Sequence, residues 1–215
     1  MSKWLNKRLW QAVMEEVGEV AVSQRDRRLE VSEAAWRVIV REGLDRTSMR
    51  AIAQEMNCTT GVVTHYFRNK QALILFALNQ VTERLQHLMV QALEKVSGTE
   101  RLVAILSCFL PVDTERQEIL KVWVAFLGYA VGRDELMVEH QQSAAQLREV
   151  IIQELKALQA AQVLRADIDP DIESNALLAL GNGVSLDSLV QAHRLSTEQQ
   201  QFVIRRYVSE VLAVC

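Results

Sequence analysis

The stretch MRAIAQEMNCTTGVVTHYFRNKQAL, residues 49–73, contains two short helical patterns separated by one tight break. An apolar stripe at helical spacing ends at Asn57, a residue that tolerates the left-handed conformation in which helices end. A second apolar pattern begins two or three residues later, where Thr59 or Thr60 can cap a new helix. The spacing predicts two helices joined by a three- to four-residue turn, which is the helix-turn-helix arrangement.

The second of these helices carries small and polar side chains, which suits entry into the major groove of DNA. Thr60 and Thr64 present hydroxyls, and Gly61 has no side chain, so the backbone can approach base edges closely. The following helix begins at Asn69-Lys70, where free N–H groups and a cation are offered to a phosphate. Short helix pairs occur in any all-α protein, so spacing alone leaves DNA binding and a structural helix pair about equally open.

The composition favours long helices in both directions from this stretch. The 215 residues are 49% hydrophobic and include only 2 prolines and 8 glycines. Helical periodicity covers nearly the whole chain, and no useful strand pattern is present, so we expect an all-α fold. Besides the two short helices, the expected helices are at about 3–22, 26–42, 69–95, 99–110, 114–131, 134–160, 170–192 and 196–214.

Charge, cysteines and targeting signals narrow the class of protein. Residues 1–70 hold 12 Lys/Arg and 9 Asp/Glu, whereas residues 71–215 hold 12 and 18, so only the front of the chain is basic. Three cysteines without a CxxC pair predict neither a disulfide framework nor a zinc site, and we expect no cofactor. No apolar run approaches the ~20 residues that cross a bilayer, and no signal peptide pattern is present, so we expect a soluble cytoplasmic protein.

The segment from Arg27 to Leu73 resembles the DNA-binding domain of the TetR family of transcriptional regulators. The matching features are an alanine-rich helix ending at Gly43, then TSMRAIA (47–53), GVVTHYF (61–67) and NK (69–70) ahead of Leu73. The resemblance implies an N-terminal three-helix helix-turn-helix domain at 25–70 and a helical-bundle ligand and dimerisation domain at 71–215. Residues 1–24 would form a helical extension that docks on an apolar surface or adds phosphate contacts.

Carried over residue by residue, the resemblance implies a set of DNA contacts. Thr47 and Ser48 would cap the first helix of the pair and touch phosphate, and Arg50 would reach a base edge or a phosphate. Lys70 would bind phosphate, whereas Thr64 stands where the family usually has tyrosine, which puts that backbone contact in doubt. The implied DNA-binding set is Thr47, Ser48, Arg50, Thr59, Thr60, Gly61, Val62, Thr64, His65, Tyr66 and Lys70.

The second half resembles the C-terminal domain of the BetI-type branch, which includes a choline-responsive repressor. The matching segments are KVWVAFLGYAV (121–131), VLRADIDPDIESNALLALGNGVSLDSL (163–189) and YVSEVL (207–212). The resemblance implies a homodimer built from the last two long helices, although the same apolar stripes could instead close the core of one chain. The implied interface residues are Leu177, Leu180, Gly181, Val184, Val203, Tyr207, Val211 and Leu212.

An effector pocket is expected between the helix at 69–95 and those at 99–160. Its aromatic residues could cage a quaternary ammonium through cation–π contacts, although aromatics at helical spacing are more often core. The effector would therefore be a hydrophobic or cationic small molecule. The candidate pocket residues are Phe76, Leu106, Phe109, Trp123, Phe126, Leu127, Tyr129 and Met137.

These features predict a dimeric repressor that binds double-stranded DNA at a palindromic operator and is released by its effector. An enzyme is disfavoured because the sequence contains no nucleophile–base pairing, no phosphate-cradling glycine loop and no metal-ligand spacing. The main alternative is an all-α protein–protein adaptor in which the helix-turn-helix is structural. Salt-dependent, sequence-selective DNA binding distinguishes the two hypotheses.

Overall fold

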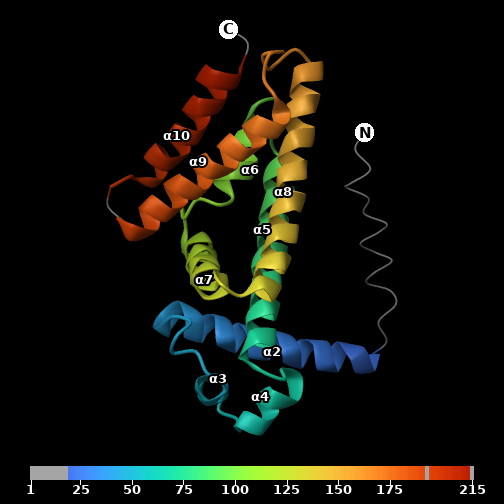
Figure 1. The fold of residues 1–215 in the computed structure, drawn as a ribbon, viewed down its shortest axis with the longest axis vertical. Coiled ribbons are helices and arrows are strands. Elements are labelled where there is room, and N and C mark those ends of the chain that lie inside the picture. Colours follow the sequence, from blue (N-terminus) through green and yellow to red (C-terminus); the bar gives the residue numbers. More distant parts are fainter. Residues whose placement is uncertain (1–18, 192–193, 214–215) are drawn as a thin grey trace. The chain divides into compact units, whose positions relative to one another are not determined.

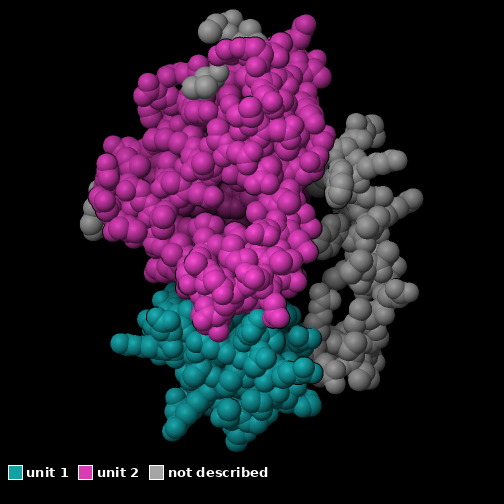
Figure 2. Space-filling model, in the orientation of Figure 1, with its two compact units in different colours: residues 1–77 teal, residues 78–215 magenta. Residues whose placement is uncertain are grey.

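The computed structural model describes residues 19–191 and 194–213, and in these ranges the chain is helical apart from turns and one isolated bridge. The expected all-α fold is confirmed. The chain divides into two compact units, residues 1–77 and residues 78–215, coloured separately in Figure 2. No helix of the described ranges is long and apolar enough to cross a membrane.

The described part of unit 1, residues 19–77, contains three helices and the beginning of a fourth (Figure 1). The helices are α2 (Glu19–Glu42), α3 (Met49–Glu55), α4 (Thr60–Tyr66) and α5 (Lys70–Leu93). Gly43 ends α2 as predicted, since its φ of +78° is in the left-handed region that glycine adopts without strain. Helix α2 runs without a break from Glu19, across the expected boundary at residue 24, and the rest of the predicted 3–22 helix lies outside the described residues.

Small residues on α2 let the short helices approach it closely. Ala34 and Ala35 are fully buried, and Ile52 of α3 and Val63 of α4 pack into the same cluster. Phe67 is 1% exposed and meets the ring of Phe76 edge to face at 5.4 Å. This cluster fixes the relative placement of α2, α3 and α4.

Unit 2 holds most of α5 and the remaining helices (Figure 1). Within this unit α8 packs against α9, and α10 packs against α6. The expected ranges agree with the structure to within a few residues, except that the last helix changes from α to π geometry at residue 208. The elements are α6 (Glu100–Ser107), α7 (Thr114–Ala130), α8 (Asp134–Ala160), α9 (Pro170–Val190), α10 (Thr197–Tyr207) and the π-helix η1 (Val208–Leu212).

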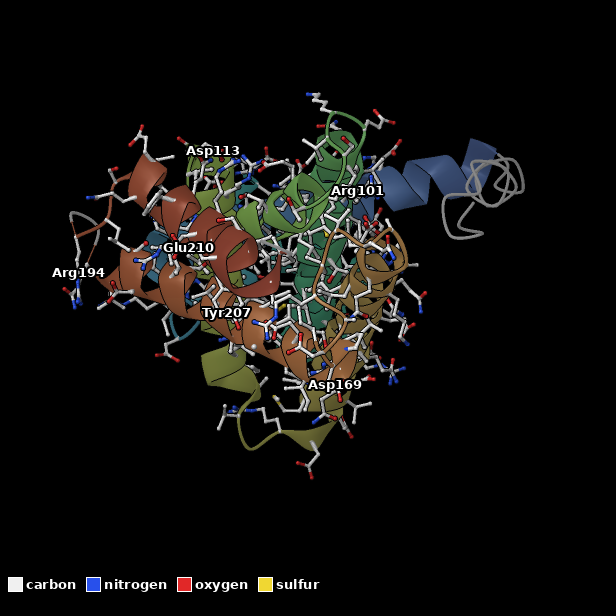
Figure 3. The ribbon with its side chains drawn as sticks, turned by 90° about the horizontal axis from the view of Figure 1, so that it is seen from above. Arg101, Asp113, Asp169, Arg194, Tyr207 and Glu210 are labelled. Carbon is white, nitrogen blue, oxygen red and sulfur yellow. The ribbon has the colours of Figure 1, made fainter. Side chains whose placement is uncertain are left out.

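Capping side chains begin three of these helices, and Figure 3 labels Asp113 and Asp169 among them. Asp113 accepts a hydrogen bond from the Arg116 backbone N–H at 2.8 Å, which starts α7. Asp169 caps α9 with Pro170 in its first turn. Ser196 and Gln199 form a reciprocal capping box at the start of α10.

The core of unit 2 is made of leucine, isoleucine and valine side chains from α6, α8, α9, α10 and η1. Two polar contacts at its margin join separate helices. Arg101 of α6 forms a bidentate ion pair with Glu154 of α8, at 2.6 and 2.8 Å. Tyr207 of α10 donates a hydrogen bond to Glu173 of α9 at 2.8 Å (Figure 3). The core is therefore a single cluster to which the last three elements all contribute.

Leu155→Ala tests how much this core contributes to stability. Leu155 is fully buried within the cluster, so its truncation should lower the free energy of unfolding by about 2–5 kcal/mol. Chemical unfolding followed by circular dichroism measures this change. Val138→Ala, on the same helix at 48% exposure, is the control and should change the stability by less than about 0.5 kcal/mol. Equal effects of both substitutions would show that the core is wrongly assigned.

Candidate nucleic-acid interface and effector pocket

The turn between α3 and α4 is built as the sequence predicts. Asn57 has a φ of +52°, and its N–H donates to the Gln54 carbonyl at 3.1 Å. The Cys58 N–H donates to the Ala53 carbonyl at 2.9 Å, which satisfies a second carbonyl at the end of α3. The carbonyls at the end of α3 are therefore hydrogen-bonded within the turn itself. Helix α4 can begin three residues after Asn57, because no longer loop is needed to cap α3.

Helix α3 is capped by Ser48, as predicted. The Ser48 hydroxyl accepts a hydrogen bond from the Ala51 N–H at 3.1 Å. Arg50 is exposed in the first turn and makes no ion pair with any residue in the described ranges. Thr47 corrects the prediction: its side chain is 1% exposed and donates to the Gly43 carbonyl at 2.9 Å, so it stabilises the α2–α3 loop and cannot touch phosphate.

Helix α4 has one buried side and one exposed side. Val63 is fully buried, whereas Thr60, Gly61 and Thr64 are exposed. The Thr64 hydroxyl donates to the Thr60 carbonyl at 3.1 Å, so its oxygen lone pairs stay available as acceptors. The exposed side carries no acidic group, since the sequence of α4 contains none. This narrow, uncharged surface is what a groove-reading helix requires.

The remaining predicted contact residues differ in exposure. Thr59 and His65 are exposed, Val62 is 37% exposed, and Tyr66 is half-buried with its ring edge-on to His65 at 4.9 Å. The structure thus brings Ser48, Arg50 and the exposed residues of α4 into one unit, with Thr47 beneath them.

Sequence reasoning missed the role of Glu55, the one acidic residue between Ser48 and Lys70. Its carboxylate accepts hydrogen bonds from Arg37 and Arg41 of α2, both at 2.8 Å. Hydrogen bonding to Arg37 and then to Arg41 lowers the pKa of Glu55. The two pairs brace α3 against α2 and neutralise a charge that would repel phosphate. No local pattern signals this contact, because the partners are 14 and 18 residues apart.

Lys70 begins α5 and is already engaged within unit 1. Its ammonium donates to the Leu44 carbonyl at 2.6 Å, a contact that ties the first turn of α5 to the α2–α3 loop. Asn69 caps the helix as predicted, accepting from the Ala72 N–H at 2.8 Å. A phosphate contact by Lys70 therefore stays a prediction, and it would have to use the donors that remain on an anchored side chain.

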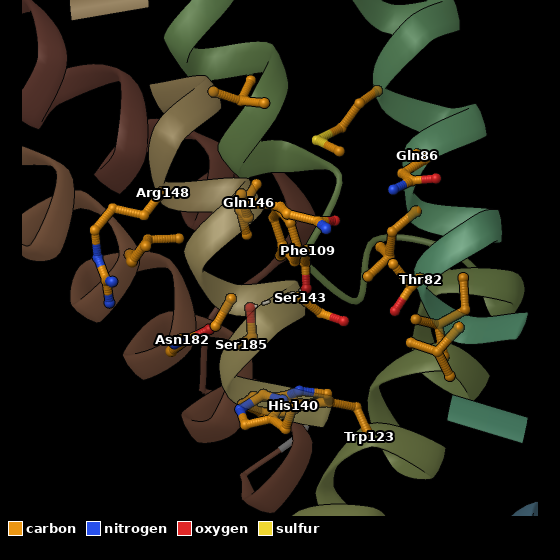
Figure 4. Close-up of a pocket in the computed structure, with 18 of the residues that line it drawn as sticks. Thr82, Gln86, Phe109, Trp123, His140, Ser143, Gln146, Arg148, Asn182 and Ser185 are labelled. Atoms are coloured by element: carbon orange, nitrogen blue, oxygen red, sulfur yellow. Dashed lines mark hydrogen bonds between the residues drawn. The ribbon is translucent and has the colours of Figure 1, made fainter. Parts of the chain in front are cut away.

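A cavity of about 410 Å³ lies within unit 2, whose surface is visibly hollowed in Figure 2. Helix α5 contributes Leu78, Val81, Thr82, Leu85, Gln86 and Met89 to the lining, and Phe109 precedes α7, which adds Ile119, Leu120 and Trp123. Helix α8 contributes His140, Ser143, Ala144, Gln146, Leu147, Arg148 and Val150, and α9 contributes Asn175, Leu178, Ala179, Asn182 and Ser185 (Figure 4). We call this cavity the effector pocket.

The pocket lies close to the predicted place but uses mostly other residues. Only Phe109 and Trp123 of the eight candidates line it. Phe126 and Leu106 are buried core, and Phe76 belongs to the cluster of unit 1. Leu127, Tyr129 and Met137 also lie outside the lining, so these six assignments are corrected. The prediction failed because it followed aromatic residues, whereas the largest share of the lining consists of aliphatic residues of α5, α7, α8 and α9, with polar positions such as Asn175 and Asn182 among them.

Most of the residues predicted for the dimer interface pack instead in the core of unit 2. The sequence left this arrangement open as the alternative to a dimer contact. Leu177, Val184 and Leu212 are buried in that core, and Gly181 packs against Leu106. Leu180, Val203 and Tyr207 are half-buried against the same cluster. The side chain of Val211 lies outside the described residues.

The exposed apolar side chains of the last helices occupy a different face. Ile172, Leu186 and Val190 of α9 are 69%, 45% and 73% exposed, and Gly183 is exposed between them. Their spacing places them on one side of the helix. Phe202 of α10 is 61% exposed. We call the α9 residues Ile172, Gly183, Leu186 and Val190 the exposed α9 face.

Two family models match the chain and together cover both units. The model described as "Bacterial regulatory proteins, tetR family" matches residues 32–76. The model described as "BetI-type transcriptional repressor, C-terminal" matches residues 98–213, which is more than half of the chain.

Individual relatives agree with these models. The chain is 28% identical over 195 residues to the HTH-type transcriptional regulator PksA of Bacillus subtilis, covering 88% of this chain and 92% of that protein. It is 23% identical over 193 residues to the HTH-type transcriptional regulator BetI of Escherichia coli, covering 88% and 95%. A solved transcriptional regulator from Saccharomonospora viridis, in complex with choline, has the same fold, with a TM-score of 0.82, 20% identity and coverage of 89% and 100%.

Glu55→Gln tests the brace between α2 and α3. At pH 7 the variant should melt at a lower temperature than the parent, because both arginines lose their charged acceptor. The folded-state pKa of Glu55 is below its ordinary value of 4.5, so the stabilisation is present above that value and is lost as the pH falls through the lowered pKa. The difference in melting temperature should therefore shrink below about pH 4.

The control for this experiment is Glu33→Gln, at an exposed position of α2 that makes no ion pair within the described residues. It should leave the melting temperature unchanged across the same pH range. A Glu55→Gln effect that does not depend on pH would contradict the ionic brace.

Proposed function

Because the chain belongs to the TetR family of transcriptional regulators and carries a BetI-type C-terminal domain, we propose that it represses transcription as a homodimer that leaves a palindromic operator when a small molecule fills the effector pocket. The family makes the chain a DNA-binding transcriptional regulator. The observation that carries the proposal is the exposed surface of α4, which is uncharged and includes Gly61, together with an exposed Arg50 that makes no ion pair within the described ranges.

The reading surface supports a division of labour between the two short helices. Helix α4 offers hydroxyl acceptors and a side-chain-free position at Gly61, so it would approach base edges. Ser48 and Arg50 stand at the start of α3, where backbone N–H groups and a guanidinium suit phosphate oxygens. Pairing of Glu55 with two arginines supports the same assignment, because it removes the repulsive charge nearest to the backbone of the DNA.

The exposed α9 face supports a second copy of this chain as the partner. Three large apolar side chains lie exposed along one stripe, with Gly183 between them. A glycine within the stripe lets two helices cross closely, and a twofold axis would pair the stripe with itself. The two reading surfaces of such a dimer would face two half-sites about 34–36 Å apart, which is one turn of DNA.

Helix α5 supports the coupling between effector and operator. Its first residue is anchored in unit 1 through Lys70, and its residues 78–89 line the pocket in unit 2. Filling the pocket would bias the position of this helix and so change the separation of the two reading surfaces. A ligand shifts the equilibrium only by its differential affinity for the DNA-bound and free conformations, so the effector must fit the released conformation better.

Selection of bound sequences from a random DNA pool at physiological salt tests the function. We expect enrichment of one palindromic site. Arg50→Ala should weaken binding to that site and reduce the slope of log affinity against log salt by about 1, as expected for a lost phosphate contact. Lys156→Ala removes the same charge from an exposed position in unit 2 and should leave both values unchanged.

Failure to enrich any sequence, with a folded protein, would contradict the proposal. It would favour the adaptor hypothesis, in which the helix-turn-helix pair is structural. An Arg50→Ala protein that binds like the parent would leave DNA binding intact but would remove Arg50 from the interface.

Leu186→Glu tests the exposed α9 face. A twofold contact would bring two such glutamates together without water, so the dimer should dissociate at micromolar concentration. Sedimentation equilibrium measures the change in mass, and circular dichroism checks folding. Val138→Glu, at a residue of α8 with similar exposure, should remain dimeric. A dimeric Leu186→Glu protein would show that the two copies meet elsewhere.

A further inference from the structure

The walls of the effector pocket differ in polarity. The α7 wall is wholly apolar, formed by Ile119, Leu120 and Trp123, and most of the α5 wall is apolar as well. The α8 and α9 walls supply most of the hydrogen-bonding groups, among them Gln146, Asn175 and Asn182. A molecule that matches both sides must be largely apolar along one flank and must bear polar atoms on the other.

The pocket lining contains no negatively charged side chain. None of the described lining residues is an aspartate or a glutamate, and Arg148 is the one permanently charged residue among them. The Arg148 Nε is buried and has no hydrogen-bond partner among the described residues (Figure 4). Burial lowers the pKa of His140, so its imidazole is neutral at pH 7. A buried cation would find no counter-charge in this lining, whereas an acceptor atom would find donor side chains such as the amides of Gln146 and Asn182.

The aromatic residues do not form a cage for a quaternary ammonium. Phe126 is 2% exposed and lies outside the lining, and the Tyr129 ring is covered by its own neighbour Arg133, with the guanidinium carbon 4.0 Å from the ring centroid. Trp123 and Phe109 remain, and they come from separate segments (Figure 4). Recognition of quaternary ammonium groups uses several aromatic faces around one cation, which this pocket does not supply.

The pocket is long. Its lining on α5 extends from Leu78 to Met89, and its lining on α8 extends from His140 to Val150. At 1.5 Å per residue, each wall spans about 15 Å. A cavity of this length and about 410 Å³ in volume suits an elongated molecule better than a compact one.

From these four observations we propose that the effector is an elongated, largely apolar molecule whose polar end accepts hydrogen bonds and carries no positive charge. The inference deepens the proposed function and rests on it, since it names the chemical class that the effector pocket takes. It also separates this chain from its structural relative that holds choline.

Isothermal titration calorimetry of the full chain, without DNA, tests the inference with three probes of equal chain length. The probes are octan-1-ol, octanoate and octyltrimethylammonium, each below its micelle concentration, with choline as a fourth. We expect octan-1-ol or octanoate to bind at least about ten-fold more tightly than octyltrimethylammonium, because the cation must be desolvated without a counter-charge. Choline should show no binding.

Two matched variants locate the binding site. Leu85→Gln places an amide in the apolar wall of α5 and should weaken binding of octan-1-ol by about ten-fold or more. Leu88→Gln makes the same change on the same helix, outside the lining, and should bind octan-1-ol like the parent. Thermal melts of both variants check folding.

Tighter binding of octyltrimethylammonium or choline would overturn the inference, and so would failure of all three eight-carbon probes to bind. Equal loss in both leucine variants would place the ligand outside the pocket and would overturn it as well. None of these outcomes touches the proposed DNA binding, which the operator selection tests separately. A protein that binds octan-1-ol but no DNA would refute the function and leave the pocket chemistry standing.

Discussion

The hydrogen bond from the Lys70 ammonium to the Leu44 carbonyl, 2.6 Å long, is the constraint on which the rest of the structure depends. It fixes the first residue of α5 to the loop that also begins α3, and Asn69 caps the helix at the same point. From there α5 continues without a break to Leu93. One helix therefore starts in unit 1, which carries α3 and α4, and continues into unit 2, where it forms a wall of the effector pocket.

Helix α9 shows how one helix can serve three purposes without conflict between them. Leu177 and Val184 face the core of unit 2, Asn182 faces the pocket, and Leu186 faces outward. A helix of 21 residues has room for three stripes because its side chains point around the full circumference. The same geometry lets a change in the pocket reach the exposed α9 face through a single element. That arrangement suits a regulator whose dimer geometry must respond to a ligand.

The sequence was sufficient for the fold because the signals that set it are local. Gly43 and Asn57 mark helix ends by backbone preference, and the structure confirms both of them. The site could be predicted only in part, since its remaining features depend on contacts across the fold. Burial of Thr47 depends on how the α2–α3 loop closes, with its hydroxyl bonded to the Gly43 carbonyl. The pocket lining depends on which face of each helix is left uncovered, and periodicity alone does not reveal this.

The coupling between pocket and operator is the central claim, and one measurement tests it most directly. Operator affinity is measured with and without octan-1-ol in Asn79→Pro, which interrupts α5 at an exposed position, and in Asn79→Ala, which keeps the helix continuous. We predict that both variants still bind the operator and octan-1-ol. Octan-1-ol should weaken operator binding of the parent and of the alanine variant, but not of the proline variant. An equal response in both variants would contradict transmission through α5.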